Sequence, residues 1–153
     1  MTFAMLLPNI TDAISNIAIA GVSTVDTDKI VASWQENANI LYPNINPPGF
    51  ITNTSIEYVT VLRGLDAPLN FHYTMNYRFL GTKLGDLTDI GLAYTNVMTK
   101  SFVIMEAIID IATIYSGKVT IELGAFSFGM KDDPVGNEYH GADFEFHIME
   151  MHP

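Results

Sequence analysis

The stretch LNFHYTMNYRFL (residues 69–80) decides the fold class, because apolar and polar side chains alternate along it almost without fault. Successive side chains of an extended strand point to opposite faces. One face therefore carries Leu69, Phe71, Tyr73, Met75, Tyr77 and Phe79, and the other carries Asn70, His72, Thr74, Asn76 and Arg78. This pattern predicts a strand of an antiparallel sheet with one face buried and one face solvated.

Three more segments have strand character. SIEYVTVL (55–62) is rich in β-branched and aromatic residues, and RGLDAP (63–68) connects it to the first strand with the composition of a hairpin turn. KVTIELGAFSFGM (118–130) and YHGADFEFHIMEM (139–151) form a second pair. Gly124 shifts the alternation in the first member of that pair, which predicts a β-bulge.

Helical periodicity appears in the segments between the strands. NITDAISNIAIA (9–20) repeats apolar residues at helical spacing and should end at Gly21. TDKIVASWQEN (27–37) predicts a second short helix with Trp34 on its apolar face. LYPNINPPGF (41–50) contains three prolines and is predicted to be a loop. The order predicts an α+β domain over residues 1–153, with one antiparallel or mixed sheet of about four strands, a long helix and one or two short N-terminal helices.

The long helix should begin at a cap, Asp86 or Thr88, and end before Gly117. Its apolar arc is wider than packing on one sheet requires. One stripe contains Ile90, Tyr94, Val97, Ile104, Ile108 and Ile111, and a second contains Met98, Phe102, Met105 and Ile109. Either the helix is buried in a larger core, or the second stripe, together with Trp34, contacts a neighbouring subunit.

Composition excludes several functional classes. The 17 acids and 7 scattered bases give a formal charge of −10, which disfavours phosphate-neutralising nucleic-acid binding and repels anionic membrane. The chain has no cysteine, so disulfides, thiolate catalysis and cysteine-ligated zinc are excluded. The start lacks a basic segment, and FVIMEAIIDIATIY (102–115) carries Glu106 and Asp110, so we expect a soluble cytosolic product without a signal or membrane span.

Histidines and acids crowd the last twenty-two residues, DDPVGNEYHGADFEFHIMEMHP. Strand parity places Asp143, Glu145 and His147 on one polar face, with His140 and His152 on the other parity. A transition-metal site needs three or four converging ligands. A solvated strand face is therefore favoured, and a metal site that uses Glu145, His147 and His140 is the alternative.

Catalytic signatures are missing from the chain. No serine lies in a G-x-S-x-G elbow, and YRFLGTKLGDL lacks the spacing of a phosphate-binding loop. Asp132 and Asp133 are adjacent carboxylates, but they lie in turn chemistry where acids solvate or bond backbone amides. The sequence predicts no catalytic residue, no metal and no cofactor.

Several segments, in order, resemble the tail terminator (tail completion) proteins of long-tailed bacteriophages. They are ANILYPN (38–44), GFITN (49–53), HYTMNYRFL (72–80), the long helix and DDPVGNEYHGADFEFHIMEM (132–151). The most specific part is D-P-x-G-N-x-Y/F-H-G-x-[DE], which runs from Asp133 to Asp143. The resemblance covers about two-thirds of the chain, in the element order expected above.

The resemblance implies a small α+β subunit of a ring, commonly a hexamer, in the tail and neck of a virion after assembly in the host cytoplasm. The ring would cap the tail tube, stop its polymerisation, join the neck or head connector, and let DNA pass without reading it. A neck stopper, a tube subunit or, less favoured, a metal-dependent hydrolase are the alternatives. Candidate acids for the lumen or for docking a tube subunit are Asp132, Asp133, Glu138, Asp143 and Glu145.

Overall fold

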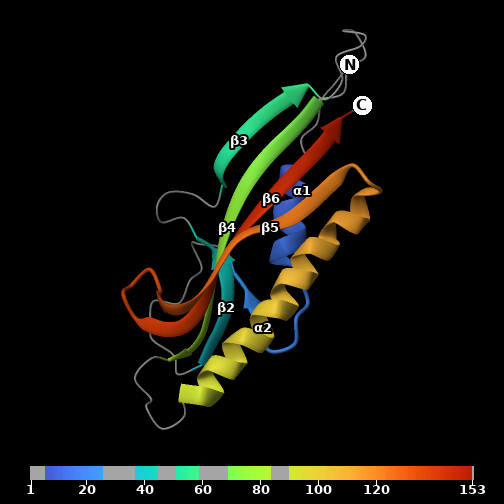
Figure 1. Cartoon of the computed structure of the whole chain (residues 1–153). Coiled ribbons are helices and arrows are strands. Elements are labelled where there is room, and N and C mark those ends of the chain that lie inside the picture. The colour runs from blue at the N-terminus through green and yellow to red at the C-terminus, as the bar shows by residue number, and fades with distance from the viewer. Residues whose placement is uncertain (1–5, 26–36, 45–50, 59–68, 84–89, 153) are drawn as a thin grey trace.

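The strand β4 (Leu69–Lys83) lies at the centre of a mixed sheet and organises the molecule (Figure 1). The computed structural model describes residues 6–25, 37–44, 51–58, 69–83 and 90–152. β6 (Glu138–His152) pairs antiparallel along one edge of β4. The other edge is shared, because β3 (Ile51–Tyr58) pairs with the first half of β4 and β2 (Asn37–Pro43) with the second half.

Two further strands complete the sheet. β5 (Val119–Asp132) pairs antiparallel with β6 at one side, and the two-residue β1 (Ser23–Thr24) pairs parallel with β2 at the other. The order is β1-β2-β4-β6-β5, with β3 joined to β4 beside this path. The α+β class is thus confirmed, but the sheet already has six strands within the described residues, rather than about four.

The prediction of a proline-rich loop over residues 41–50 is wrong for residues 41–43, which belong to β2. Ala38, Ile40 and Tyr42 alternate along this strand and are buried. Pro43 is the last residue of β2, where a proline need not donate to a ladder. The strand is short and is followed in the sequence by two more prolines, Pro47 and Pro48, so the composition of the region indicates a loop.

The helices differ from prediction mainly at their ends. α1 (Leu7–Ser15) stops well before Gly21, which instead has a φ of 75° beside the Ile19–Val22 bridge. α2 (Ile90–Asp110) continues as the 3-10 helix η2 (Ile111–Tyr115). Ser116 and Gly117 then have left-handed φ values of 52° and 81°, which confirms the predicted end before Gly117.

Several predictions lie outside the described residues. These are the second short helix up to residue 36 with Trp34, the turn over 63–68, and the Asp86 or Thr88 cap. The last residue of that short helix, Asn37, belongs instead to β2. The predicted strand 55–62 is described as far as Tyr58, within β3.

α1 and α2 pack against the same face of the sheet (Figure 1). The predicted apolar face of β4 is confirmed for the described side chains: Phe71, Tyr73, Met75, Tyr77 and Phe79 are all buried. On β6, Phe144, Phe146 and Ile148 point to the same core, as parity predicted. Val97, Ile104, Ile108 and Ile111 of the first helical stripe cover this core, whereas Tyr94 is 46% exposed.

The predicted bulge in β5 is confirmed, since its register with β6 shifts between Leu123 and Phe126. A Cβ on Gly124 would lie 2.3 Å from His147 Nε2 and 2.8 Å from Glu145 Oε1. Glycine therefore lets these side chains lie over the bulge. No helix within the described ranges is long and apolar enough to cross a membrane.

Candidate functional site

A single aspartate fixes the turn that joins β5 to β6. Asp133 is 5% exposed, and its Oδ1 accepts hydrogen bonds from the backbone N–H groups of Val135 and Asn137, both at 2.9 Å. Its Oδ2 accepts a third from Asn137 Nδ2, also at 2.9 Å. The backbone N–H of Asp133 bonds the Asn137 carbonyl, and Gly136 supplies the left-handed φ of 100°. Asp133 therefore holds the turn and does not offer its carboxylate to a partner.

The rigid turn presents an apolar apex between two acids. Pro134 is exposed, and Val135 is 60% exposed. Asp132 and Glu138, one on each side of the apex, are exposed as well. We call residues 132–138 the hairpin tip. Its curled end lies at the left of Figure 1, at the far end of β5 from the η2 turn.

Arg78 ties the hairpin tip to the centre of the sheet. Its guanidinium forms two bonds with Asp143, Nε to Oδ1 at 2.7 Å and Nη2 to Oδ2 at 3.0 Å. Nη1 donates to the backbone carbonyl of Asp132 at 3.0 Å. The hydrogen bonds that Arg78 donates to Asp143 raise the pKa of Arg78 above its ordinary value. Lys131 Nζ also lies 3.3 Å from Asp143 Oδ2. The negative charge of Asp143 is therefore balanced by two cations of the same chain, Arg78 and Lys131.

Tyr42 of β2 adds a third link to the same carbonyl, with its hydroxyl 3.3 Å from the oxygen of Asp132. Burial raises the pKa of Tyr42 to about 12, although the nearby Arg78 opposes part of this rise. The hydroxyl therefore stays protonated and able to donate at any physiological pH. Strands β2, β4 and β5 are thus joined at the base of the hairpin tip.

Glu145 and His147 form a hydrogen-bonded pair on the open face of the sheet. His147 Nε2 lies 2.9 Å from Glu145 Oε1, and Nδ1 lies 3.5 Å from Thr74 Oγ1. The second contact is weak at that distance. Thr74 is also nine-tenths buried, so this row of hydroxyl, imidazole and carboxylate is poorly placed for nucleophilic catalysis.

The alternative metal site of Glu145, His147 and His140 is not assembled. His140 has the opposite parity and lies on the helix side, where it lines a hollow with Tyr94 and Val97. Within the described ranges, no group of three or more histidine, aspartate or glutamate side chains is placed to hold a metal ion.

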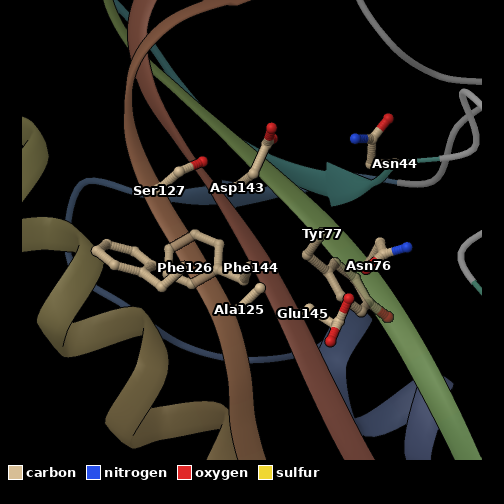
Figure 2. Close-up of a pocket in the computed structure, with 9 residues that line it drawn as sticks. All are labelled: Asn44, Asn76, Tyr77, Ala125, Phe126, Ser127, Asp143, Phe144 and Glu145. Atoms are coloured by element: carbon tan, nitrogen blue, oxygen red, sulfur yellow. The ribbon is translucent and has the colours of Figure 1, made fainter.

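Two shallow depressions mark the open face. The first, of about 220 Å³, lies at the bulge, with Asn76, Ser127, Asp143 and Glu145 around its polar rim (Figure 2). The second, of about 360 Å³, is lined by side chains that include His72, Thr74, Thr120, Glu122, His147 and Met149. The first also has Tyr77, Phe126 and Phe144 in its lining, whereas the second is mainly polar, and both lie directly on strands.

A chain of aromatic rings runs from the core to the surface between α2 and β5. Phe144 contacts Phe126 with ring centroids 5.2 Å apart, and Phe126 contacts Phe128 at 4.4 Å. Phe128 in turn lies 6.2 Å from Tyr94 and 6.4 Å from Phe102. We define the aromatic strip as the outer part of this chain with the exposed methionine beside it: Tyr94, Phe102, Phe126, Phe128 and Met130.

The predicted contact stripe of α2 is only partly exposed. Phe102 is 57% exposed, Met98 and Ile109 are half-buried, and Met105 is buried in the core at 8%. The expectation of one outward-facing stripe is therefore wrong for Met105, because this side of α2 lies against β5. Sequence reasoning missed that Phe128 joins Tyr94 to Phe102 and that Met130 is exposed, although Phe126-x-Phe128-x-Met130 alternates after the bulge.

The described residues thus offer two features suited to contact with other macromolecules, the hairpin tip and the aromatic strip. Both present exposed side chains beside buried or half-buried ones on well-anchored backbone, and neither has the ligand geometry of a metal site or the hydroxyl access of a nucleophile. No protein-family model matches the chain, and no curated protein shows significant similarity to it.

Proposed function

We propose that this chain is the subunit of a ring that caps the tail tube of a long-tailed bacteriophage, as a tail terminator. The ring would stop tube polymerisation, join the tail to the neck or head connector, and leave a channel through which DNA passes. The sequence resemblance described above supports this proposal, and its most specific segment runs from Asp133 to Asp143.

The observation that carries the proposal is the hairpin tip. The segment that most resembles tail terminators forms a turn held by three hydrogen bonds to Asp133, with Val135 exposed at its apex. A contact element that is already ordered loses little conformational entropy on docking. A rigid apolar apex is therefore well suited to contact the end ring of a tube, where every subunit must engage in the same geometry.

Ring formation requires a heterologous interface, with two different surfaces on each subunit. The aromatic strip and the hairpin tip differ in chemistry, since the strip is uncharged and the tip is flanked by Asp132 and Glu138. The aromatic strip is thus available as one of the two surfaces for neighbouring subunits, and the hairpin tip is available for the next component along the tail.

Of the five acids predicted to face the lumen or to dock a tube subunit, three are paired within the chain and two are exposed. Asp143 is paired with Arg78 and Lys131, Glu145 with His147, and Asp133 with its own turn. Asp132 and Glu138 keep exposed side chains. These two remain the best candidates to face transiting DNA, where like charge prevents adhesion.

Tube assembly in vitro tests the proposal. Purified tube protein from the same phage should form long cylinders alone and shorter, capped ones when this chain is added, as measured by negative-stain imaging. Val135→Asp should abolish capping, because a buried carboxylate at the docked apex would lack a partner. Val103→Asp is the matched control, since Val103 is 46% exposed on α2, away from the tip. Unchanged tube lengths with the wild-type chain would contradict capping.

The same images separate the alternatives. A tube subunit would itself grow into long cylinders, whereas a terminator would stop at one ring. A neck stopper would bind the connector and leave tube lengths unchanged.

A further inference from the structure

We propose that the aromatic strip is the surface on which a second copy of this chain docks. The claim that this contact builds a ring rests on the proposed function. The identification of the strip as the docking surface rests only on the side chains of α2 and β5. The strip comprises Tyr94 and Phe102 of α2 together with Phe126, Phe128 and Met130 of β5.

The rings of the strip are contiguous and partly exposed. Phe128 contacts both Tyr94 and Phe102, so the rings from the two elements form one patch. Tyr94 is 46% exposed, and Phe102 and Met130 are each 57% exposed. An aromatic side chain has a surface of about 150–250 Å², and methionine is of similar size, so these three residues together leave roughly 300 Å² of largely apolar surface in water. Exposed patches of that size are often functional contact sites.

The shape of the strip suits a protein surface rather than a small molecule. The hollow between Tyr94, Val97, Phe128 and Gly129 is too tight to admit a water-sized sphere. Small-molecule sites are concave cavities of several hundred cubic ångströms. A shallow aromatic surface beside a strand is instead the type of region that a flat protein partner covers.

The strip also borders a free strand edge. β5 pairs only with β6 among the described strands and is the last strand on its side of the sheet. Edge strands usually carry charges, prolines or bulges that prevent pairing. β5 has a bulge at Gly124, but the residues that follow, Phe126 to Met130 (FSFGM), contain no charge and no proline. This part of the edge is therefore unprotected.

Charge favours a second copy as the occupant. Each chain has a formal charge of −10, so two copies repel wherever their acidic surfaces face one another. The strip and the adjoining FSFGM segment are uncharged, so a second acidic copy can dock there without meeting a carboxylate of the strip. A basic partner would gain no electrostatic attraction from this surface. A standard interface buries about 800 Å² per partner, and an apolar centre of roughly 300 Å² with a polar rim fits that size.

The experiment compares two glutamate variants on neighbouring residues of α2. Phe102→Glu places a carboxylate in the strip. Val103→Glu is the control: it adds the same charge at a side chain that is 46% exposed and takes no part in the ring contacts of the strip. Sedimentation velocity measures self-association of the full chain between 0.05 and 0.5 M NaCl at a fixed series of protein concentrations, and circular dichroism verifies that both variants fold.

Wild-type chain should associate, and more tightly at high salt, because screening weakens the repulsion between acidic copies. Phe102→Glu should raise the dissociation constant at least tenfold, as expected when a central aromatic contact is lost. Val103→Glu should behave like the wild type.

A wild-type chain that stays monomeric at all salt concentrations, or equal dissociation by both variants, would overturn the inference. Self-association through the strip without tube capping would refute only the proposed function. Capping by an oligomer that tolerates Phe102→Glu would refute only the placement of the interface.

Discussion

Asp133→Ala should destabilise the fold although the residue lies in a surface turn. The aspartate is 5% exposed and accepts two backbone and one side-chain hydrogen bond, all at 2.9 Å. A hydrogen bond to a charged group contributes about 1.5–3 kcal/mol to stability. The N–H of Val135 can regain a bond to water, because that residue is exposed, so its loss is partly offset. The net loss should be about 2–3 kcal/mol.

Urea denaturation followed by circular dichroism measures this loss. The unfolding midpoint should fall while the slope stays unchanged, since the surface exposed on unfolding is the same. Asp133→Asn keeps an oxygen acceptor for the backbone N–H groups and should lose about half as much. Glu138→Gln is a control that removes an exposed acid from the same turn. A loss below about 0.5 kcal/mol for Asp133→Ala would refute the assigned role, because surface substitutions without such contacts fall in that range.

Three further predictions concern the elements that hold the hairpin. Gly141→Ala should lower the unfolding free energy by about 1–3 kcal/mol in urea denaturation, because its Cβ would lie 2.3 Å from the Phe79 carbonyl oxygen; wild-type stability would contradict this contact. Arg78→Ala should speed amide hydrogen exchange at the hairpin tip, because it removes the bond to the Asp132 carbonyl and the two bonds to Asp143. Exchange unchanged from wild type would refute this role of Arg78. The raised pKa of Tyr42 predicts stability that is complete below pH 10 and lost as the pH rises through about 12. Tyr42→Phe should therefore show a shallower fall in urea midpoint over pH 10–12, and an identical fall would count against the burial of this hydroxyl.

Local patterns predicted the parts of the fold that depend on them. The alternation from Leu69 to Leu80 predicted the buried face of β4, and the parity of residues 142–148 predicted the core face of β6. The other face of β4 is less solvated than predicted, because Asn70 and Thr74 are buried. The break at Gly124 predicted the bulge because a register shift is visible in one strand alone. The sequence did not predict β2, because its seven residues adjoin prolines and form a strand by pairing with β4, which is far away in the sequence.

The candidate site could be predicted less well from the sequence, because the hairpin tip and the aromatic strip depend on tertiary contacts. Turn chemistry allows Asp133 either to be solvated or to bond backbone amides, and the structure shows the second, with the backbone N–H groups of Val135 and Asn137 as donors. The partial burial of the Met98 and Met105 stripe depends on β5 lying beside α2. Helical periodicity reports which residues share a face but not what covers them.

Native mass spectrometry combined with negative-stain imaging of the purified chain tests ring formation most directly. A ring-forming terminator should give one closed species, expected from the resemblance to be a hexamer of 16.9 kDa subunits, with no growth into longer objects as concentration rises. A species that remains at 16.9 kDa under all conditions, or open-ended cylinders that lengthen with concentration, would contradict a capping ring.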